Sequence, residues 1–243
     1  MPPENSTDER IAARRRRLLE FTGEIEELCR DDPGARTALR TGLRRDLDHV
    51  PRMHRFIARW LPRDSSEAEQ RAYYAVAAMI AAQPRSRYPD PDDEPGTDPQ
   101  QETSAEQEPP ESAGQESQAD GDSPAAERYG ASLGRAFALA VYESPERERT
   151  MREAAAEARL NLLTRQSLGG LHRHLPASVG YLRELDVPVD WAQLLSDLAS
   201  WPAYCDRIAR RWLQDYYIER NRALSQVADH ADQDEATRLS TPA

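Results

Sequence analysis

The feature that most constrains the fold of this chain is the segment 88–125, which contains seven prolines and no Leu, Ile, Val, Met, Phe or Trp. A segment without these side chains cannot bury enough apolar surface to offset the conformational entropy lost on ordering. It also carries twelve acidic residues and no arginine. We therefore expect a disordered acidic loop, and the core of the 243-residue chain must come from the sequence on either side of it.

On both sides of this loop, apolar residues recur at the three- and four-residue spacing of amphipathic helices, and no segment alternates with the two-residue period of a strand. Helix-start signals occur at Ser6 with Glu9, Asp32–Pro33, Pro51, Ser66 with Glu69, Ser144–Pro145, and Asp190 with Gln193. The helix that starts at Ser144–Pro145 is expected to run to Leu163, and Pro84 is expected to end the helix before the loop. These patterns predict an all-α bundle of about nine helices in two packed parts.

The same signals divide the chain into four regions. We expect an N-terminal helical part over residues 1–87, the acidic loop over 88–125, a C-terminal helical part over 126–224, and a flexible acidic tail over 225–243. The tail is assigned because its charged side chains are four acids and one arginine. The two helical parts therefore have to supply any functional surface.

The net charge of −11 conceals a mildly basic body. Outside the acidic loop, 32 arginines face 31 acidic residues, and leaving out the tail as well gives an excess of four positive charges. There is no lysine, so every permanent cation is a planar guanidinium, which matches the geometry of phosphate. A genome that favours arginine codons would give the same composition without any functional cause.

Several classes of protein are excluded or disfavoured. The two cysteines, Cys29 and Cys205, are too few for a disulfide framework or a zinc cluster. Without lysine, neither a P-loop nor a Schiff base can form. Neither pair of histidines (His49/His54 and His172/His174) has the spacing that places two metal ligands on one helical face. We therefore expect no enzymatic activity, cofactor or metal site.

The chain also lacks a run of apolar residues long enough to span a membrane. Its N-terminal segment has no apolar core of the secretory type, because the run Arg14–Arg17 interrupts it. We expect a cytoplasmic protein with no membrane contact.

Many arginines in the predicted helices have no acidic residue one turn away and are candidates for phosphate contact. They are Arg40, Arg55, Arg59, Arg135, Arg159, Arg165, Arg173 and Arg207. Two sets are expected to form basic stripes on helical faces: Arg36, Arg40 and Arg44, and Arg52, Arg55 and Arg59. Such rows can bind successive phosphates with strong salt dependence. The alternative is that folding brings acids to these arginines, or that they only face water.

Five short stretches occur in an order that resembles a known family. They are Ala38–Leu39–Arg40, Tyr73–Tyr74–Ala75–Val76–Ala77, Ala131–Ser132–Leu133–Gly134–Arg135–Ala136, Arg159–Leu160–Asn161–Leu162–Leu163, and Val187–Pro188–Val189–Asp190–Trp191 with a following Trp201. Each is weak alone, but together they span about residues 36–217 outside the acidic loop. In this order they resemble the CasB family, the small subunit of the subtype I-E CRISPR surveillance complex called Cascade.

The resemblance implies an all-helical, non-catalytic protein. Two copies of it would sit in Cascade against the other subunits and hold the guide RNA–target DNA hybrid and the displaced non-target strand, while base pairing reads the sequence. The family's basic contact positions fall best on Arg40 and Arg159. Arg135 matches a family arginine, although its segment has helix packing as an alternative role. Arg165 and Arg173 lie in a region that the family keeps basic. Charge alone supports nucleic-acid contact by Arg207, Arg210 and Arg211, and helical spacing alone supports it for Arg36 and Arg44. Nothing is carried onto the acidic loop or the run Arg14–Arg17, where this chain departs from the family.

A second hypothesis is a helical adaptor that binds protein without touching nucleic acid. It rests on aromatic residues in the last quarter of the chain, which suit either an interface or a C-terminal core: Trp191, Trp201, Trp212, Tyr216 and Tyr217. A helix-turn-helix regulator is less well supported, because no short turn precedes a polar recognition helix. Salt dependence of binding distinguishes the first two hypotheses.

Overall fold

The computed structural model describes residues 5–83, 130–142 and 149–240, and within these ranges it contains helices and no strand. The α-helices are α1 (Asn5–Asp31), α2 (Pro33–Arg40), α3 (Pro51–Ile57), α4 (Glu67–Ala81), α6 (Leu133–Tyr142), α7 (Glu153–Thr164), α8 (Leu168–Glu184) and α9 (Trp191–Ser240), with 3-10 turns η1 (Leu47–His49) and η2 (Ala58–Trp60). The all-α prediction is confirmed, and the described part has eight α-helices where about nine were expected. The predicted loop 88–125 lies outside the described residues.

Helices α2 and α4 start where the capping signals predicted, whereas α1 already begins at Asn5, so that Ser6, the expected cap, lies inside the helix. The Asp32 side chain accepts a hydrogen bond from the backbone N–H of Ala35 at 2.9 Å, and Pro33 occupies the first turn of α2. The Ser66 hydroxyl does the same for the N–H of Glu69 at the start of α4. Each cap satisfies a backbone donor that the helix itself leaves unpaired.

Helix α4 is central to the body, packing against α1, α2, α8 and α9. It is mostly alanine and aromatic on its buried faces, so neighbouring helices approach closely. Phe21 of α1 meets Tyr73 of α4 edge to face, with ring centroids 4.8 Å apart. One continuous core contains residues from both sides of the undescribed segment, so the two helical parts pack together and are not separate cores.

The start of α7 differs from the prediction. Residues 149–152 are not helical, so the expected helix from Ser144–Pro145 to Leu163 is not continuous; residues 143–148 lie outside the described part. The reason is a contact with α6: the backbone N–H of Met151 donates to the Ala140 carbonyl at 2.8 Å, and the Met151 side chain is buried. The chain thus folds back on α6 before α7 begins.

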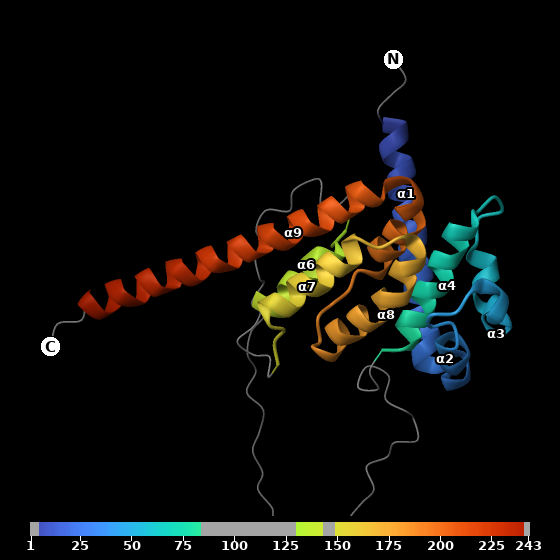
Figure 1. Ribbon diagram of the computed structural model, residues 1–243, viewed down its shortest axis with the longest axis horizontal. Helices are drawn as coiled ribbons and strands as arrows, with labels where there is room; N and C mark the ends of the chain where they lie inside the picture. The colour runs from blue at the N-terminus through green and yellow to red at the C-terminus, as the bar shows by residue number, and fades with distance from the viewer. Residues whose placement is uncertain (1–4, 84–129, 143–148, 241–243) are drawn as a thin grey trace, which may run out of the picture.

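Helix α9 is kinked and long. It starts at the predicted cap, where Asp190 accepts a hydrogen bond from the N–H of Gln193 at 2.8 Å. Pro202 cannot donate a helical hydrogen bond, and Tyr204 has non-helical backbone angles (φ −137°, ψ 26°), so the helix bends there. Beyond the body α9 projects as a single rod (Figure 1). The expected tail from residue 225 is helical as far as Ser240.

Helices α6 and α9 approach each other closely at Gly134. A Cβ atom added there would overlap the backbone carbonyl of Trp212, so a residue with any side chain would force the helices apart. The Trp212 ring also packs against the Trp201 ring across the kink, tilted by 41° and with ring centroids 5.3 Å apart. The Ser132–Arg135 stretch is therefore a packing element, with Arg135 on its outer side.

Candidate nucleic-acid interface

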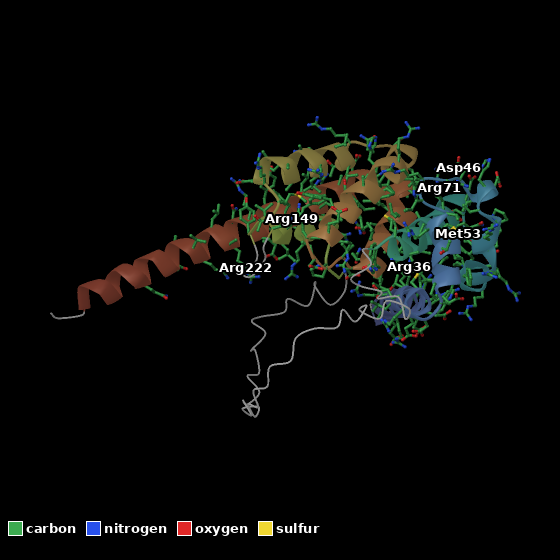
Figure 2. All side chains as sticks on the ribbon, turned by 90° about the horizontal axis from the view of Figure 1, so that it is seen from below. Arg36, Asp46, Met53, Arg71, Arg149 and Arg222 are labelled. Atoms are coloured by element: carbon green, nitrogen blue, oxygen red, sulfur yellow. The ribbon has the colours of Figure 1, made fainter. Side chains whose placement is uncertain are left out.

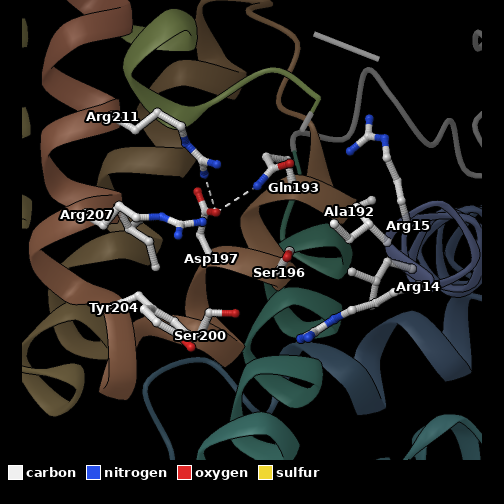
Figure 3. Close-up of a pocket in the computed structure, with 13 residues that line it drawn as sticks. Arg14, Arg15, Ala192, Gln193, Ser196, Asp197, Ser200, Tyr204, Arg207 and Arg211 are labelled. Carbon is white, nitrogen blue, oxygen red and sulfur yellow. Dashed lines mark hydrogen bonds and ion pairs between the residues drawn. The ribbon is translucent and has the colours of Figure 1, made fainter. Parts of the chain in front are cut away.

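A cavity of about 390 Å³ lies between α1 and the kinked part of α9. We call it the α1/α9 pocket. Four arginines line it, together with one acid, Asp197: they are Arg14 and Arg15 from α1, and Arg207 and Arg211 from α9 (Figure 3). A cavity with this lining attracts anions, because each guanidinium is permanently charged and offers several N–H donors.

The single acid of the pocket is fully engaged inside the protein. Asp197 is 3% exposed and accepts hydrogen bonds from the Gln193 amide and the Trp212 indole, both at 2.7 Å, while Arg211 forms an ion pair with it. Burial raises the pKa of Asp197, and Arg211 opposes that shift. Arg211 therefore stabilises the fold here, and Asp197 does not neutralise the remaining arginines.

Arg207 and Tyr204 form the open side of the pocket. Tyr204 is 56% exposed at the kink, and the Arg207 guanidinium lies over its ring, 5.5 Å from the centroid. An exposed aromatic ring next to an exposed arginine combines a surface for stacking a base with a donor for phosphate. The kink is what turns the Tyr204 ring out of the helix packing.

Arg14 and Arg15 were missed by the sequence reasoning, which assigned nothing to the run Arg14–Arg17. In Figure 3, Arg14 points into the pocket from the α1 wall, opposite Arg207. Its side chain is 52% exposed, with a weak ion pair to Glu69 at 3.9 Å. Arg15 lies at the rim, paired with Asp190 at 2.9 Å. The charge run itself was the available signal, but only the fold shows that it faces α9.

The first predicted stripe does not form as expected. Helix α2 ends at Arg40, and Arg44 lies in the following turn with a left-handed backbone (φ 59°), so the three arginines do not share one helical face. Arg36 donates to the backbone carbonyls of Ala81 and Gln83 at 3.2 and 3.0 Å, which ties α2 to the end of α4. Arg40 and Arg44 are exposed.

The second stripe lies on α3 and η2 and is exposed. The guanidinium of Arg55 lies 4.4 Å from the centroid of the Phe56 ring, and Arg52 is exposed nearby in sequence. Arg59, which has no acid one turn away in sequence, forms an ion pair with Glu24 of α1. Folding thus supplies a partner to one member of this stripe, as the alternative interpretation allowed.

The other predicted arginines are spread over α6, α7, α8 and α9. Arg159 lies 4.7 Å from the centroid of the Tyr181 ring, and Arg135 pairs with Glu219 at 3.1 Å beside a second cavity of about 270 Å³, the α6/α9 groove, which Arg222 also lines. The predicted arginines that are exposed and form no ion pair within the described residues include Arg40, Arg44, Arg165, Arg173, Arg207 and Arg210. The Gln166 carbonyl, next to Arg165, accepts a hydrogen bond from Trp201. Figure 2 shows nitrogen-tipped side chains projecting on several sides of the body.

The aromatic residues behind the adaptor hypothesis are mainly core. Trp191, Trp201, Trp212 and Tyr216 are buried, and only Tyr217 of this set is exposed. Among the residues that the structure describes, no group of three or more acidic, His or Cys side chains is placed to bind a metal. No helix in the described ranges is long and apolar enough to cross a membrane.

Comparison with known proteins gives a family and two related structures. The family model for "CRISPR-associated protein Cse2" matches residues 35–217. A chain from a solved "CRISPR RNA-guided surveillance complex, pre-nicking" is 30% identical, with a TM-score of 0.62, and the match covers 89% of this chain and 98% of that one. A chain from another "CRISPR RNA-guided surveillance complex" is 31% identical with the same TM-score, covering 91% and 99%. The curated proteins contain no match.

These matches confirm the resemblance drawn from the five stretches, because the family model extends over most of the chain and the related chains match it almost end to end. The chain therefore belongs to the Cse2 family, the CasB small subunit of type I-E Cascade.

Proposed function

We propose that this chain is a non-catalytic, nucleic-acid-binding subunit of a Cascade surveillance complex, which helps to hold the guide RNA–target DNA hybrid and the displaced strand. The observation that carries the proposal is the α1/α9 pocket, where Arg14 and Arg207 face each other beside the exposed ring of Tyr204. Family membership gives the setting, and the titles of the related structures name RNA-guided complexes.

The mechanism is electrostatic and does not depend on the base sequence of the bound nucleic acid. A single strand entering the pocket places a phosphate between the two guanidiniums and stacks a base on Tyr204. Each well-placed contact contributes on the order of 1 kcal/mol, which shifts the occupancy of an open R-loop about fivefold. The exposed Arg40, Arg165 and Arg173 extend the contacts to other parts of the surface.

Protein partners use another part of the molecule. The projecting part of α9 exposes the large apolar side chains of Ile218, Leu224 and Val227. Such residues on a helix that leaves the body favour contact with other proteins of the assembly. We propose that the other Cascade subunits and a second copy of this chain are its protein partners. The pure adaptor is the competing hypothesis.

The test is reconstitution of the complex with variant subunits. Arg40→Ala, Arg159→Ala and Arg207→Ala are each expected to weaken target-DNA binding about fivefold, while co-elution of all subunits is unchanged. Arg222→Ala is the matched control, because Arg222 is also exposed on α9, about four turns beyond Arg207. Target binding that is normal in all of these variants at physiological salt would support the adaptor instead.

A further inference from the structure

A small cavity lies where the turn after α2 covers the junction of α4 and α8. Its volume is about 20 Å³, and the side chains around it include Arg44, Arg45, Arg71, Tyr74 and His172. A volume of this size admits one water molecule or one oxygen atom of a larger group. The cavity is separate from the α1/α9 pocket, with which it shares no lining residue.

Two buried polar atoms at this cavity lack a partner. His172 is 6% exposed, and its Nε2 atom has no hydrogen-bond partner among the described residues. The Nε atom of Arg71 is also buried without a hydrogen-bond partner among the described residues, although Arg71 Nη2 pairs with Asp46 at 2.7 Å (Figure 2). Buried polar groups are almost always satisfied, so an oxygen atom in the cavity would complete both.

The mouth of the cavity is positively charged. Arg44 and Arg45 are exposed there, and Arg44 has the left-handed backbone that residues other than glycine seldom adopt. Gly42 allows the turn to sit this close, because a Cβ atom at that position would overlap Met53 Sδ. Three guanidiniums therefore line the cavity and no lining residue is acidic, while Asp46 lies outside the lining and pairs with Arg71.

The protonation states favour an acceptor in the cavity. Burial, with the nearby Arg71, lowers the pKa of His172 to about 4, so the ring is neutral at pH 7. A neutral imidazole with its hydrogen on Nε2 donates from that atom, and guanidinium nitrogen can only donate. In that tautomer His172 Nε2 and Arg71 Nε are both donors, and the arginines at the mouth favour an anionic oxygen over water as their acceptor.

We propose that this cavity, the His172 seat, takes one oxygen of a nucleic-acid backbone phosphate. Arg71 Nε–H and His172 Nε2–H donate to that oxygen, and Arg44 and Arg45 contact the other phosphate oxygens. The inference rests on the proposed function for the source of the phosphate, but the donor geometry does not depend on it.

The test follows the ring nitrogens of His172 by NMR in the full-length chain. Inorganic phosphate and a short single-stranded DNA are titrated in separate samples, His172→Phe identifies the signal, and His174→Phe on the same helix is the matched control. Both probes are expected to shift the His172 signal. Arg44→Ala with Arg45→Ala should lower the salt dependence of DNA binding by about one phosphate contact, because both arginines contact the same phosphate. Asp46→Asn should strengthen phosphate binding by about twofold, because it removes the carboxylate that pairs with Arg71.

The outcomes separate this inference from the proposed function. If DNA binds the chain without shifting the His172 signal, phosphate binding at the His172 seat is overturned and the proposed function stays intact. A shift with inorganic phosphate alone would overturn the assignment to a nucleic-acid backbone. A chain that binds no DNA at any salt, inside or outside the complex, would overturn the proposed function and the assigned source of the phosphate together.

Discussion

The α1/α9 pocket and the α6/α9 groove both lie along α9 and are both lined by arginine, but their acidic residues pair with different partners. In the pocket, Asp197 is buried and is satisfied by Arg211, Gln193 and Trp212, so Arg14 and Arg207 remain for a ligand. In the groove, Glu219 pairs with Arg135. The difference teaches that the number of arginines does not locate an anion site. The site lies where the nearby acidic side chains are already engaged with other partners.

The largest effect is expected from applying one substitution to both regions. Arg211→Met leaves the buried carboxylate of Asp197 without its cation and should cost about 3–5 kcal/mol of unfolding free energy. Arg135→Met removes a half-exposed ion pair and should cost at most about 1 kcal/mol. Urea denaturation measures both.

The pH dependence of that loss provides a control. Without Arg211 the pKa of Asp197, already raised by burial, rises further, and the protonated carboxyl no longer needs a cation. The deficit of Arg211→Met should therefore shrink as the pH falls. Equal losses for the two substitutions, or a loss independent of pH, would remove the distinction between pocket and groove.

A smaller effect is expected from the aromatic side chains along α9. Tyr204→Ala removes the proposed stacking surface and should weaken binding of single-stranded DNA by about 1–3 kcal/mol, which is about fivefold or more. Tyr217→Ala is the matched control, because Tyr217 is also exposed on α9 but does not line the α1/α9 pocket. A fluorescence-anisotropy titration compares them, and equal effects of the two variants would contradict the role of the kink.

The smallest effect is expected from releasing the paired arginine of the groove. Glu219→Gln removes the carboxylate that neutralises Arg135 and should raise affinity for single-stranded DNA about twofold at low salt. Glu219→Gln combined with Arg135→Ala should show no gain. If the single variant binds DNA no more tightly than the unaltered chain, the ion pair of Arg135 with Glu219 does not explain why the pocket and the groove differ in anion binding.

Much of the fold was predictable because its signals are local. The caps at Asp32, Ser66 and Asp190 and the helical spacing of apolar residues fix where helices start. The start of α7 was not predictable, because it depends on the long-range contact of Met151 with Ala140. The helix beyond residue 225 was missed because composition indicated a tail, whereas the segment continues an established helix.

The candidate site was predictable only in part, for the same reason. Arg207 and Arg211 were named on charge, but their different roles depend on Asp197, fourteen residues before Arg211, and on the kink at Tyr204. Arg36 and Arg59 find partners through folding that no local pattern reveals. Arg14 enters the pocket because α1 packs against α9, which is a tertiary contact.

The measurement that tests the central claim most directly is the salt dependence of single-stranded DNA binding to the purified chain. The unaltered chain is compared with two variants, the double variant Arg14→Ala/Arg207→Ala and the single variant Arg222→Ala. Each protein is measured with and without residues 88–125, which carry twelve acids. The slope of log K against log salt is expected to fall by about one in the double variant, which loses the phosphate held between Arg14 and Arg207, and to stay unchanged in Arg222→Ala. A slope that is the same in all three proteins would contradict this expectation.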